Sequence, residues 1–303
     1  MSKKNELDGI LPALSTICDR YGEIDEEGQR SLVSFNIEKG VDGVVALVMN
    51  GEFYKYTDEE RKKITDVVID ETNGRVPVLI GTTYPGTVPT TASSKYAQDA
   101  GADGVVVLPP FFNPKEANLS LYDHYTQVAR SIDIPIMIQE TEEITGSYFT
   151  PSLIEKLNAS NDNIRYFKTE GALALSKISD VHKLTKGRVK SFGGYFGFSL
   201  IEELRHGASG TVPGCSIPEI CLEAYRAQRK GHVEKAKAEL ERYSPYLDFN
   251  VINMISFPQI DKEVLKMRGE IKSAHVRGPN VSLTDDAVEK LKKVLKIIGI
   301  LDS

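Results

Sequence analysis

Short apolar runs alternate with longer amphipathic segments over about the first 230 residues, and this alternation constrains the fold more than any other feature. The run Val44-Val45-Ala46-Leu47 is apolar at successive positions, which is typical of parallel strands covered on both faces. Such runs followed by helical segments indicate βα units, and Thr57-Asp58-Glu59-Glu60 has the pattern of a helix-opening capping box. Eight strands are expected, at residues 10–14, 43–47, 76–80, 104–108, 135–138, 164–168, 189–192 and 210–212.

Eight βα units predict an α/β fold of the TIM (β/α)8 barrel type over residues 1–230, with its active site at the carboxyl ends of the strands. An open doubly wound sheet is the alternative, because a sequence pattern does not show closure. From 231 to 303 the alternation stops, and helical segments are expected at 233–250, 259–267 and 284–300. We expect this C-terminal helical extension to pack on the barrel or on a neighbouring subunit, because an apolar helical stripe needs a cover.

Charge balance and the spacing of cysteine and histidine argue against several classes of function. The chain has 37 basic and 43 acidic residues, a net charge of -6, and so no general basic field for nucleic acid or an anionic membrane. Its 3 cysteines and 5 histidines form no CxxC, HxxxH or HxH pair, so neither a metal site nor a disulfide framework is predicted. The polar N-terminus has no apolar stretch of signal-peptide length. We therefore expect a cytoplasmic protein that needs no cofactor.

Lys168 is the strongest candidate for a catalytic residue. It ends the β-prone run at 164–168 and is followed at once by Thr169, Glu170 and Gly171. A lysine at the carboxyl end of a strand can be buried there, which disfavours its charged form and frees a nucleophilic amine. This placement is the one that a Schiff-base enzyme needs, although most lysines are solvated surface charges.

Several fragments, in order, resemble the Schiff-base lyases that include dihydrodipicolinate synthase and N-acetylneuraminate lyase. The resemblance runs from residue 9 to about residue 247. It implies a TIM barrel, a homo-oligomer (dimer or tetramer), a small-molecule 2-oxo acid such as pyruvate as substrate, and Lys168 as the Schiff-base lysine. The fragments are those at 40–45, 50–53, 57–61, 74–78, 100–104, 109–113, 135–138, 167–168 and 207–210.

The departures from the synthase bear on the reaction. Where its Gly-Thr-Thr-Gly-Glu motif follows the second strand, residues 48–52 read Val-Met-Asn-Gly-Glu, so Met49 and Asn50 replace the threonines. Gln139 replaces the tyrosine that ends the synthase's fifth strand, and its side chain is an amide with no useful proton to give. Phe112 replaces the second tyrosine, and Ile144 replaces the arginine that meets the second substrate's carboxylate. Dihydrodipicolinate synthase activity is therefore disfavoured.

A subset of the family fits better, because the stretches at 135–139 and 166–170 look like those of the 2-keto-3-deoxyarabonate dehydratases. The resemblance predicts a lyase that dehydrates, or cleaves by aldol chemistry, a 2-keto-3-deoxy sugar acid. Glu140 and Glu170 then become the available proton carriers near Lys168, with a salt bridge or a solvated charge as the simpler reading of each. The alternatives are 4-hydroxy-tetrahydrodipicolinate (dihydrodipicolinate) synthase with a rearranged relay, and a non-catalytic 2-oxo-acid-binding protein that kept the barrel.

The remaining site residues are expected to bind substrate. Its carboxylate should meet backbone N–H groups and the Asn50 side chain at the Asn50-Gly51 turn, unless Asn50 only forms the turn. Gln139 is expected to bond a substrate hydroxyl or the imine region, or to be a satisfied core amide.

Residues 193–197 read Gly-Gly-Tyr-Phe-Gly and predict a turn that opens the pocket, with Gly194 and Tyr195 at the substrate. A phosphate cradle is the weaker reading. Phe112 is expected in the pocket wall, and Phe111 and Phe196 in the wall or the core.

Overall fold

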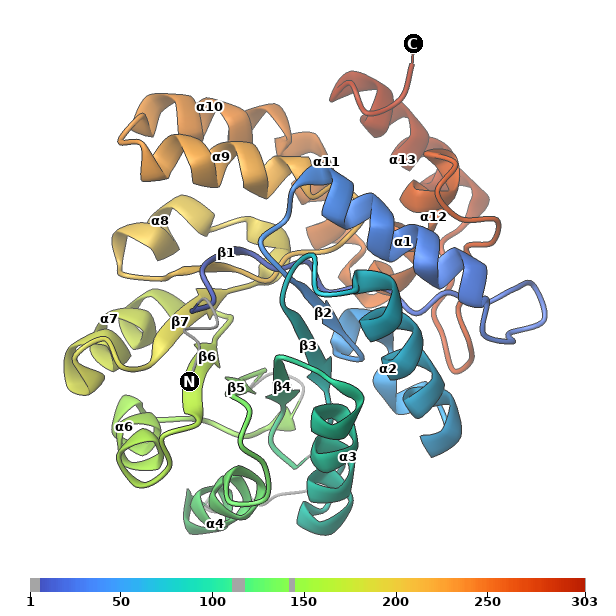
Figure 1. Ribbon diagram of the computed structural model, residues 1–303. Helices are drawn as coiled ribbons and strands as arrows, with labels where there is room; N and C mark the ends of the chain where they lie inside the picture. The colour runs from blue at the N-terminus through green and yellow to red at the C-terminus, as the bar shows by residue number, and fades with distance from the viewer. Residues whose placement is uncertain (1–5, 111–117, 142–144, 303) are drawn as a thin grey trace.

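The computed structural model describes residues 6–110, 118–141 and 145–302. This part of the chain forms eight parallel strands in one sheet, surrounded by helices (Figure 1). The strands are β1 (Gly9–Ile10), β2 (Val44–Ala46), β3 (Val78–Gly81), β4 (Gly104–Val107), β5 (Ile136–Gln139), β6 (Ile164–Lys168), β7 (Lys190–Gly193) and β8 (Gly210–Thr211). Each overlaps one of the strands expected from the sequence, so this prediction is confirmed.

The sheet closes on itself. Its strand order is β1-β8-β7-β6-β5-β4-β3-β2, and the segment after β1 joins the two ends. There the N–H of Leu14 donates to the carbonyl of Val45 at 2.7 Å, and the N–H of Val45 donates to the carbonyl of Pro12 at 3.0 Å. Ala13 forms bridges both to Val45 and to Gly214. The fold is therefore the predicted TIM barrel and not the open sheet.

Alternate strand residues point into the barrel. Side chains such as Val44 and Ala46 belong to the large cluster between the sheet and the helices. The residues between them form a separate inner cluster of Leu7, Leu11, Ala13, Val45, Val48, Leu79, Val106, Met137, Tyr166, Phe192 and Val212. Because side chains alternate along a strand, Gln139 and Lys168 point inward like Met137 and Tyr166, two residues before them. Both end their strands, at the end of a barrel where active sites lie.

The helices that follow the strands are α1 (Glu26–Lys39), α2 (Asp58–Thr72), α3 (Thr87–Ala100), α4 (Asn118–Ala129), α6 (Pro151–Ser160), α7 (Ala174–Thr185), α8 (Leu200–Arg205) and α9 (Glu219–Arg229). The capping box expected at the start of α2 is confirmed. Thr57 Oγ1 accepts a hydrogen bond from the N–H of Glu60 at 3.4 Å, and Glu60 Oε2 accepts one from the N–H of Thr57 at 2.9 Å.

Four further helices come after the barrel units: α10 (Val233–Arg242), α11 (Ser244–Ile252), α12 (Phe257–Met267) and α13 (Asp285–Ile297). The single helix expected at 233–250 is two helices, because the chain leaves the helical path at Tyr243 and Pro245 lies in the first turn of α11. In Figure 1, α10 lies beside α9, and α13 packs on α11 and α12. The division of the chain at residue 230 stays a prediction.

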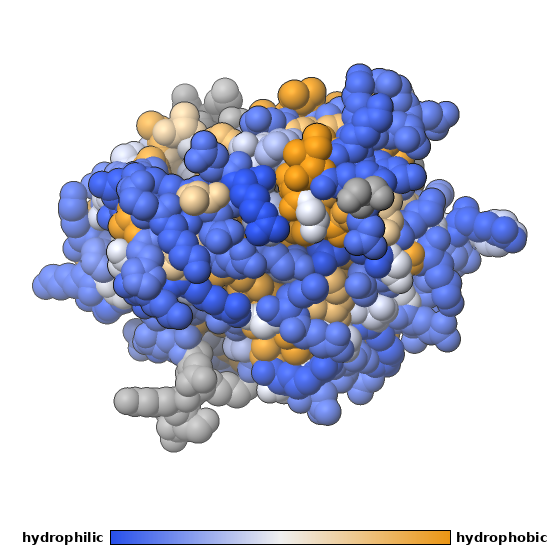
Figure 2. Space-filling model, turned by 90° about the horizontal axis from the view of Figure 1, so that it is seen from above, coloured by the Kyte–Doolittle hydropathy of each residue, from blue (hydrophilic) through white to orange (hydrophobic). Residues whose placement is uncertain are grey.

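The surface is polar for the most part. On the face seen in Figure 2, separate hydrophobic groups lie among predominantly hydrophilic residues. Among the described residues, no helix combines the length and the apolar composition needed to cross a membrane.

Candidate active site

Lys168 lies at the centre of the candidate site. Its side chain points into the barrel from the end of β6, and the residue is 5% exposed. Its Nζ lies 2.8 Å from Oε2 of Glu170, so the amine has a carboxylate partner within the site. Both residues line a cavity of about 770 Å³ at the carboxyl ends of the strands. The cavity has room for a small organic acid around the amine.

The cavity wall is built from the strand ends and from the C-terminal helices. Six of the residues predicted from the sequence lie in it: Met49, Asn50, Gln139, Lys168, Glu170 and Tyr195. Gln139 is the register partner of Lys168 on the neighbouring strand, so the two side chains lie next to each other. Phe196 also lines the cavity, and the extension contributes Met254, Ile255 and Phe257. Phe111, Phe112 and Ile144 lie outside the described residues.

Glu140 lies behind the wall in a buried ion pair. Its Oε1 is 2.7 Å from Nζ of Lys177 and accepts a hydrogen bond from the N–H of Phe149 at 2.7 Å. Its Oε2 accepts a hydrogen bond from Oγ1 of Thr169 at 2.9 Å. These three donors hold the carboxylate in place. The role of Glu140 as a proton carrier therefore stays a prediction, and its geometry is that of a structural ion.

Lys177 is a second cavity lysine that the sequence pattern did not single out. It lies on α7, is 4% exposed, and its Nζ sits 3.7 Å from the centre of the Tyr148 ring. The burial of Lys177 could have been inferred from the sequence, because this lysine shares a helical face with Ala174, Ile178 and Val181, which are buried. A lysine on the apolar face of a predicted helix needs a buried anion as a partner.

The turn at 193–197 faces the Lys168–Glu170 pair. The N–H of Tyr195 donates to Oε1 of Glu170 at 2.8 Å, and a Cβ atom at Gly194 would overlap the Glu170 carboxylate. The glycine therefore makes room for this carboxylate, while Gly194 itself is not among the described wall residues. The space beside this turn, where the sequence pattern suggested a weak phosphate site, is filled by the Glu170 side chain.

Glu203 on α8 lies next to this pair and was not predicted from the sequence. The residue is 3% exposed. Burial and the neighbouring charge of Glu170 raise the pKa of Glu203 to about 8, against the opposing effect of Lys168. A pKa so far above the usual value of a carboxyl group marks a candidate functional residue when the group also lies beside a cavity.

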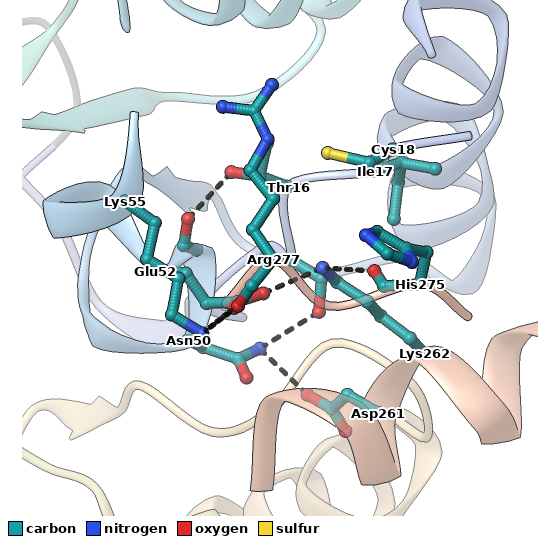
Figure 3. A network of polar contacts seen from close by, with 12 residues as sticks. Thr16, Ile17, Cys18, Asn50, Glu52, Lys55, Asp261, Lys262, His275 and Arg277 are labelled. Carbon is teal, nitrogen blue, oxygen red and sulfur yellow. Dashed lines mark hydrogen bonds and ion pairs between the residues drawn. The ribbon is translucent and has the colours of Figure 1, made fainter. Parts of the chain in front are cut away.

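Asn50 belongs to a polar network that links the strand ends to α12 (Figure 3). Its Nδ2 donates to the carbonyl of Ala13 at 2.6 Å and to Oδ2 of Asp261 at 2.8 Å. Both amide hydrogens thus have acceptors in the protein. A bond from this side chain to a substrate carboxylate stays a prediction, and the backbone N–H groups of η1 (Met49–Gly51) are the simpler donors.

Gly51 and Glu52 complete this loop. A Cβ atom at Gly51 would lie 3.0 Å from the carbonyl oxygen of Leu14, so the close approach that glycine permits here is to the protein's own backbone. Glu52 is fully buried and bridges two lysines, with Oε1 2.7 Å from Nζ of Lys262 and Oε2 2.7 Å from Nζ of Lys55. Lys262 also donates to the carbonyl of His275 at 3.0 Å. Consecutive residues of α12 therefore hold the loop at 50–52.

Comparison with known proteins places the chain in a family. The model of the dihydrodipicolinate synthetase family matches residues 6–298. The chain belongs to this family. The resemblance of the sequence fragments to these lyases is thereby confirmed.

Relatives in this family have different reactions. The chain is 34% identical to the putative 2-dehydro-3-deoxy-D-gluconate aldolase YagE of Escherichia coli K12, over 95% of this chain and 96% of the relative. It is 32% identical to a 4-hydroxy-tetrahydrodipicolinate synthase of Syntrophus aciditrophicus, over 93% and 95%. It is 28% identical to the L-2-keto-3-deoxyarabonate dehydratase of Azospirillum brasilense, over 95% and 93%. Membership therefore gives a lyase family, and the reaction must be argued from the site.

The fold comparison agrees with the barrel. The crystal structure of Escherichia coli YagE in complex with pyruvate superposes with a TM-score of 0.90 at 30% identity, covering 97% of this chain and 99% of that one. A crystal structure of a dihydrodipicolinate synthase superposes with a TM-score of 0.90 at 27% identity, covering 97% and 100%.

Proposed function

We propose that the protein is a Schiff-base-forming lyase that dehydrates a 2-keto-3-deoxy sugar acid. The observation that carries this proposal is the position of the Lys168 amine, which lies inside the cavity within 2.8 Å of the Glu170 carboxylate. A nucleophilic lysine paired with a proton acceptor is the arrangement that imine formation with a 2-oxo acid requires. The pyruvate complex of YagE supports a 2-oxo acid as the ligand class.

Glu170 first activates the amine. In the ion pair Lys168 carries the extra proton, and transfer of this proton to Glu170 leaves a neutral amine that attacks the C2 carbonyl of the substrate. The adduct then loses its C2 oxygen as water, with the proton returned by Glu170. The product is an iminium in which nitrogen is bonded to C2, and Glu170 is again a carboxylate.

The same carboxylate serves the second stage. The iminium withdraws electrons from C3, so Glu170 can remove a C3 proton and give an enamine. The enamine then expels the C4 hydroxyl, which takes the proton from Glu170 and leaves as water. Hydrolysis of the resulting unsaturated iminium releases the product and restores Lys168. Gln139, beside Lys168 in the barrel, has no proton to exchange but can hold a substrate hydroxyl by hydrogen bonds.

The proton carriers of the site suffice for dehydration. Aldol cleavage must remove a proton from the C4 hydroxyl, whereas dehydration must add one to it. Gln139 occupies the place where the synthase has a tyrosine, and an amide cannot take that proton, so the Glu170 carboxylate would have to take it. Glu140 is held by three hydrogen-bond donors, which leaves Glu170 as the carboxylate next to the amine. After removing the C3 proton, Glu170 is an acid, as dehydration requires.

Aldol cleavage of the same substrate class is the second candidate. It is supported by the two Escherichia coli relatives described as aldolases, YagE at 34% identity and YjhH at 29% identity. The two reactions differ in their products, because only the aldolase releases pyruvate.

Reductive trapping tests the proposal. Incubation with pyruvate and cyanoborohydride should add one pyruvate to the peptide that contains Lys168. Lys168→Arg should abolish the adduct, and Lys177→Arg, which changes the other buried lysine of the same cavity, should retain it. Adduct formation that persists without Lys168 would end the proposal.

Turnover then separates the reactions and the proton carriers. A panel of 2-keto-3-deoxy acids should give water loss, measured as the dehydrated product, and no pyruvate release. We expect Glu170→Gln to lower turnover by about 10²- to 10⁴-fold, the range typical of a lost general acid-base group. Glu140→Gln should keep the chemistry if the protein folds. Equal rates in wild type and Glu170→Gln would refute the assignment of Glu170.

A further inference from the structure

Two carboxyl groups, those of Glu170 and Glu203, lie on either side of the turn that begins at Gly193. A Cβ atom at Gly193 would overlap the carboxyl group of Glu203, and one at Gly194 would overlap the carboxyl group of Glu170. The two consecutive glycines therefore each make room for an acid. Glu203 comes from α8 and Glu170 from the loop after β6, so the pair is assembled from two βα units.

The backbone of this turn bonds both acids. The N–H of Tyr195 donates to Oε1 of Glu170 at 2.8 Å, and the N–H of Gly194 donates to the carboxyl group of Glu203. In the described part of the chain, Oε2 of Glu203 is buried without a hydrogen-bond partner. An ionised carboxylate in such a place is costly, whereas a neutral acid costs much less.

The groups that face Glu203 come from three elements. Glu170 and Lys168 act on it from the end of β6 and the loop that follows, and Cys221 lies near it on α9. Burial and the charge of Glu203 raise the pKa of the Cys221 thiol, so this thiol carries no charge at neutral or mildly alkaline pH. The charge balance of the cluster under those conditions therefore depends on Glu203, Glu170 and Lys168.

We propose that Glu203 is a positioning residue for imine formation. As a neutral acid it leaves the charges of the Lys168–Glu170 pair balanced, and as an anion it holds Lys168 in its ammonium form. This inference rests on the proposed function, because it concerns the reactivity of the same amine. Protonated Glu203 adds no charge, so Glu170 can take the proton from Lys168. Ionised Glu203 adds a second negative charge, which favours the charged amine and slows its attack on the carbonyl.

The sign of the pH dependence follows from the pKa of Glu203, which burial and Glu170 raise to about 8. Below this value wild type and Glu203→Gln carry the same charge at this position. Above it only the wild type gains the extra negative charge. The ratio of the imine-formation rate in Glu203→Gln to that in wild type should therefore rise as the pH passes through about 8.

The test measures the initial rate of pyruvate trapping by cyanoborohydride from pH 6.5 to 9.5. We expect the two rates to agree within about twofold at low pH and Glu203→Gln to be about five- to tenfold faster at high pH, because the variant lacks the second negative charge near the amine. Glu203→Asp keeps the acid and should follow the wild type. Glu202→Gln is the matched control, because Glu202 precedes Glu203 on the same helix but is exposed and paired with Arg205.

A merely structural carboxyl group would change stability or the rate at every pH alike. A ratio that stays constant from pH 6.5 to 9.5 would therefore overturn the inference while leaving the Schiff-base proposal intact. A wild-type protein that forms no adduct at any pH would instead contradict the proposed function. If Glu203→Gln does not fold, infrared titration of the wild type decides: a protonated-carboxyl band should disappear around pH 8, and its absence at pH 7 would overturn the inference.

Discussion

Replacing Lys262 by methionine tests how strongly α12 holds the loop at 50–52. The Lys262 and Glu52 side chains are both 0% exposed, with Nζ and Oε1 2.7 Å apart. Methionine fills a similar volume but leaves Glu52 as a buried charge with Lys55 as its remaining cation. Breaking a buried pair in this way costs about 3–5 kcal/mol of unfolding free energy. Because Lys55 still compensates Glu52, we expect about 3 kcal/mol, at the lower end of that range.

The assay is chemical unfolding, together with the melting temperature. For a chain of this size about 3 kcal/mol corresponds to a fall of roughly 5 °C in Tm. The double variant Lys262→Met with Glu52→Gln should not recover the loss, because it leaves the buried Lys55 ammonium without its carboxylate partner. Lys272→Met is the matched control, because Lys272 pairs with Glu27 on the surface, where the side chains are 82% and 86% exposed. It should change stability by less than about 0.5 kcal/mol. Equal effects of Lys262→Met and Lys272→Met would refute the reasoning.

Two further predictions concern other ion pairs. Glu140→Gln leaves the buried Lys177 ammonium without its carboxylate, so unfolding in denaturant should show a loss of about 2–4 kcal/mol in unfolding free energy. Lys168 should still trap pyruvate in this variant. A variant as stable as the wild type would contradict this prediction. The Arg277 guanidinium beside Glu60 lowers the pKa of that carboxyl to about 2. Its stabilising effect is therefore present above about pH 4.5 and is lost as the pH falls towards 2, so the stability difference between wild type and Arg277→Gln should shrink over this range. A difference independent of pH would refute the second prediction.

The strands could be predicted because short β-prone runs alternate with helical segments, and runs such as 44–47 are apolar at successive positions. Lys168 could be predicted because a lysine ends one of these β-prone runs. The sequence pattern favoured a barrel but could not exclude an open sheet, since closure depends on the backbone bonds of Pro12 and Leu14 to Val45. Glu203 was missed because its proximity to Glu170 depends on how α8 packs on β7 and β8. The two glycines at 193–194 indicated that some group lies close to the backbone there, but sequence alone does not say which group fills the space beside a glycine.

The loop at 50–52 is a second case in which contacts between distant parts of the chain could not be predicted from the sequence. Asn50 was expected at a turn that meets the substrate, and Glu52 follows that turn in the fragment that resembles the family. Their partners Asp261 and Lys262 lie more than 200 residues further along the chain, in a helix expected only to cover apolar surface. Local spacing cannot predict such a long-range pairing of charges, and the orientation of the Asn50 amide depends on it.

The cavity wall draws Met254 and Ile255 from the segment between α11 and α12, and Phe257 from the start of α12, whereas Lys168 comes from a strand end. The reactive amine and the apolar lip above it thus belong to separate stretches of polypeptide. Evolution, or an engineer, can lengthen or reshape that lip to admit longer sugar acids while the imine chemistry underneath stays as it is. Chimeras that exchange residues 251–257 among relatives should accordingly inherit chain-length preference from the donor and catalytic competence from the recipient.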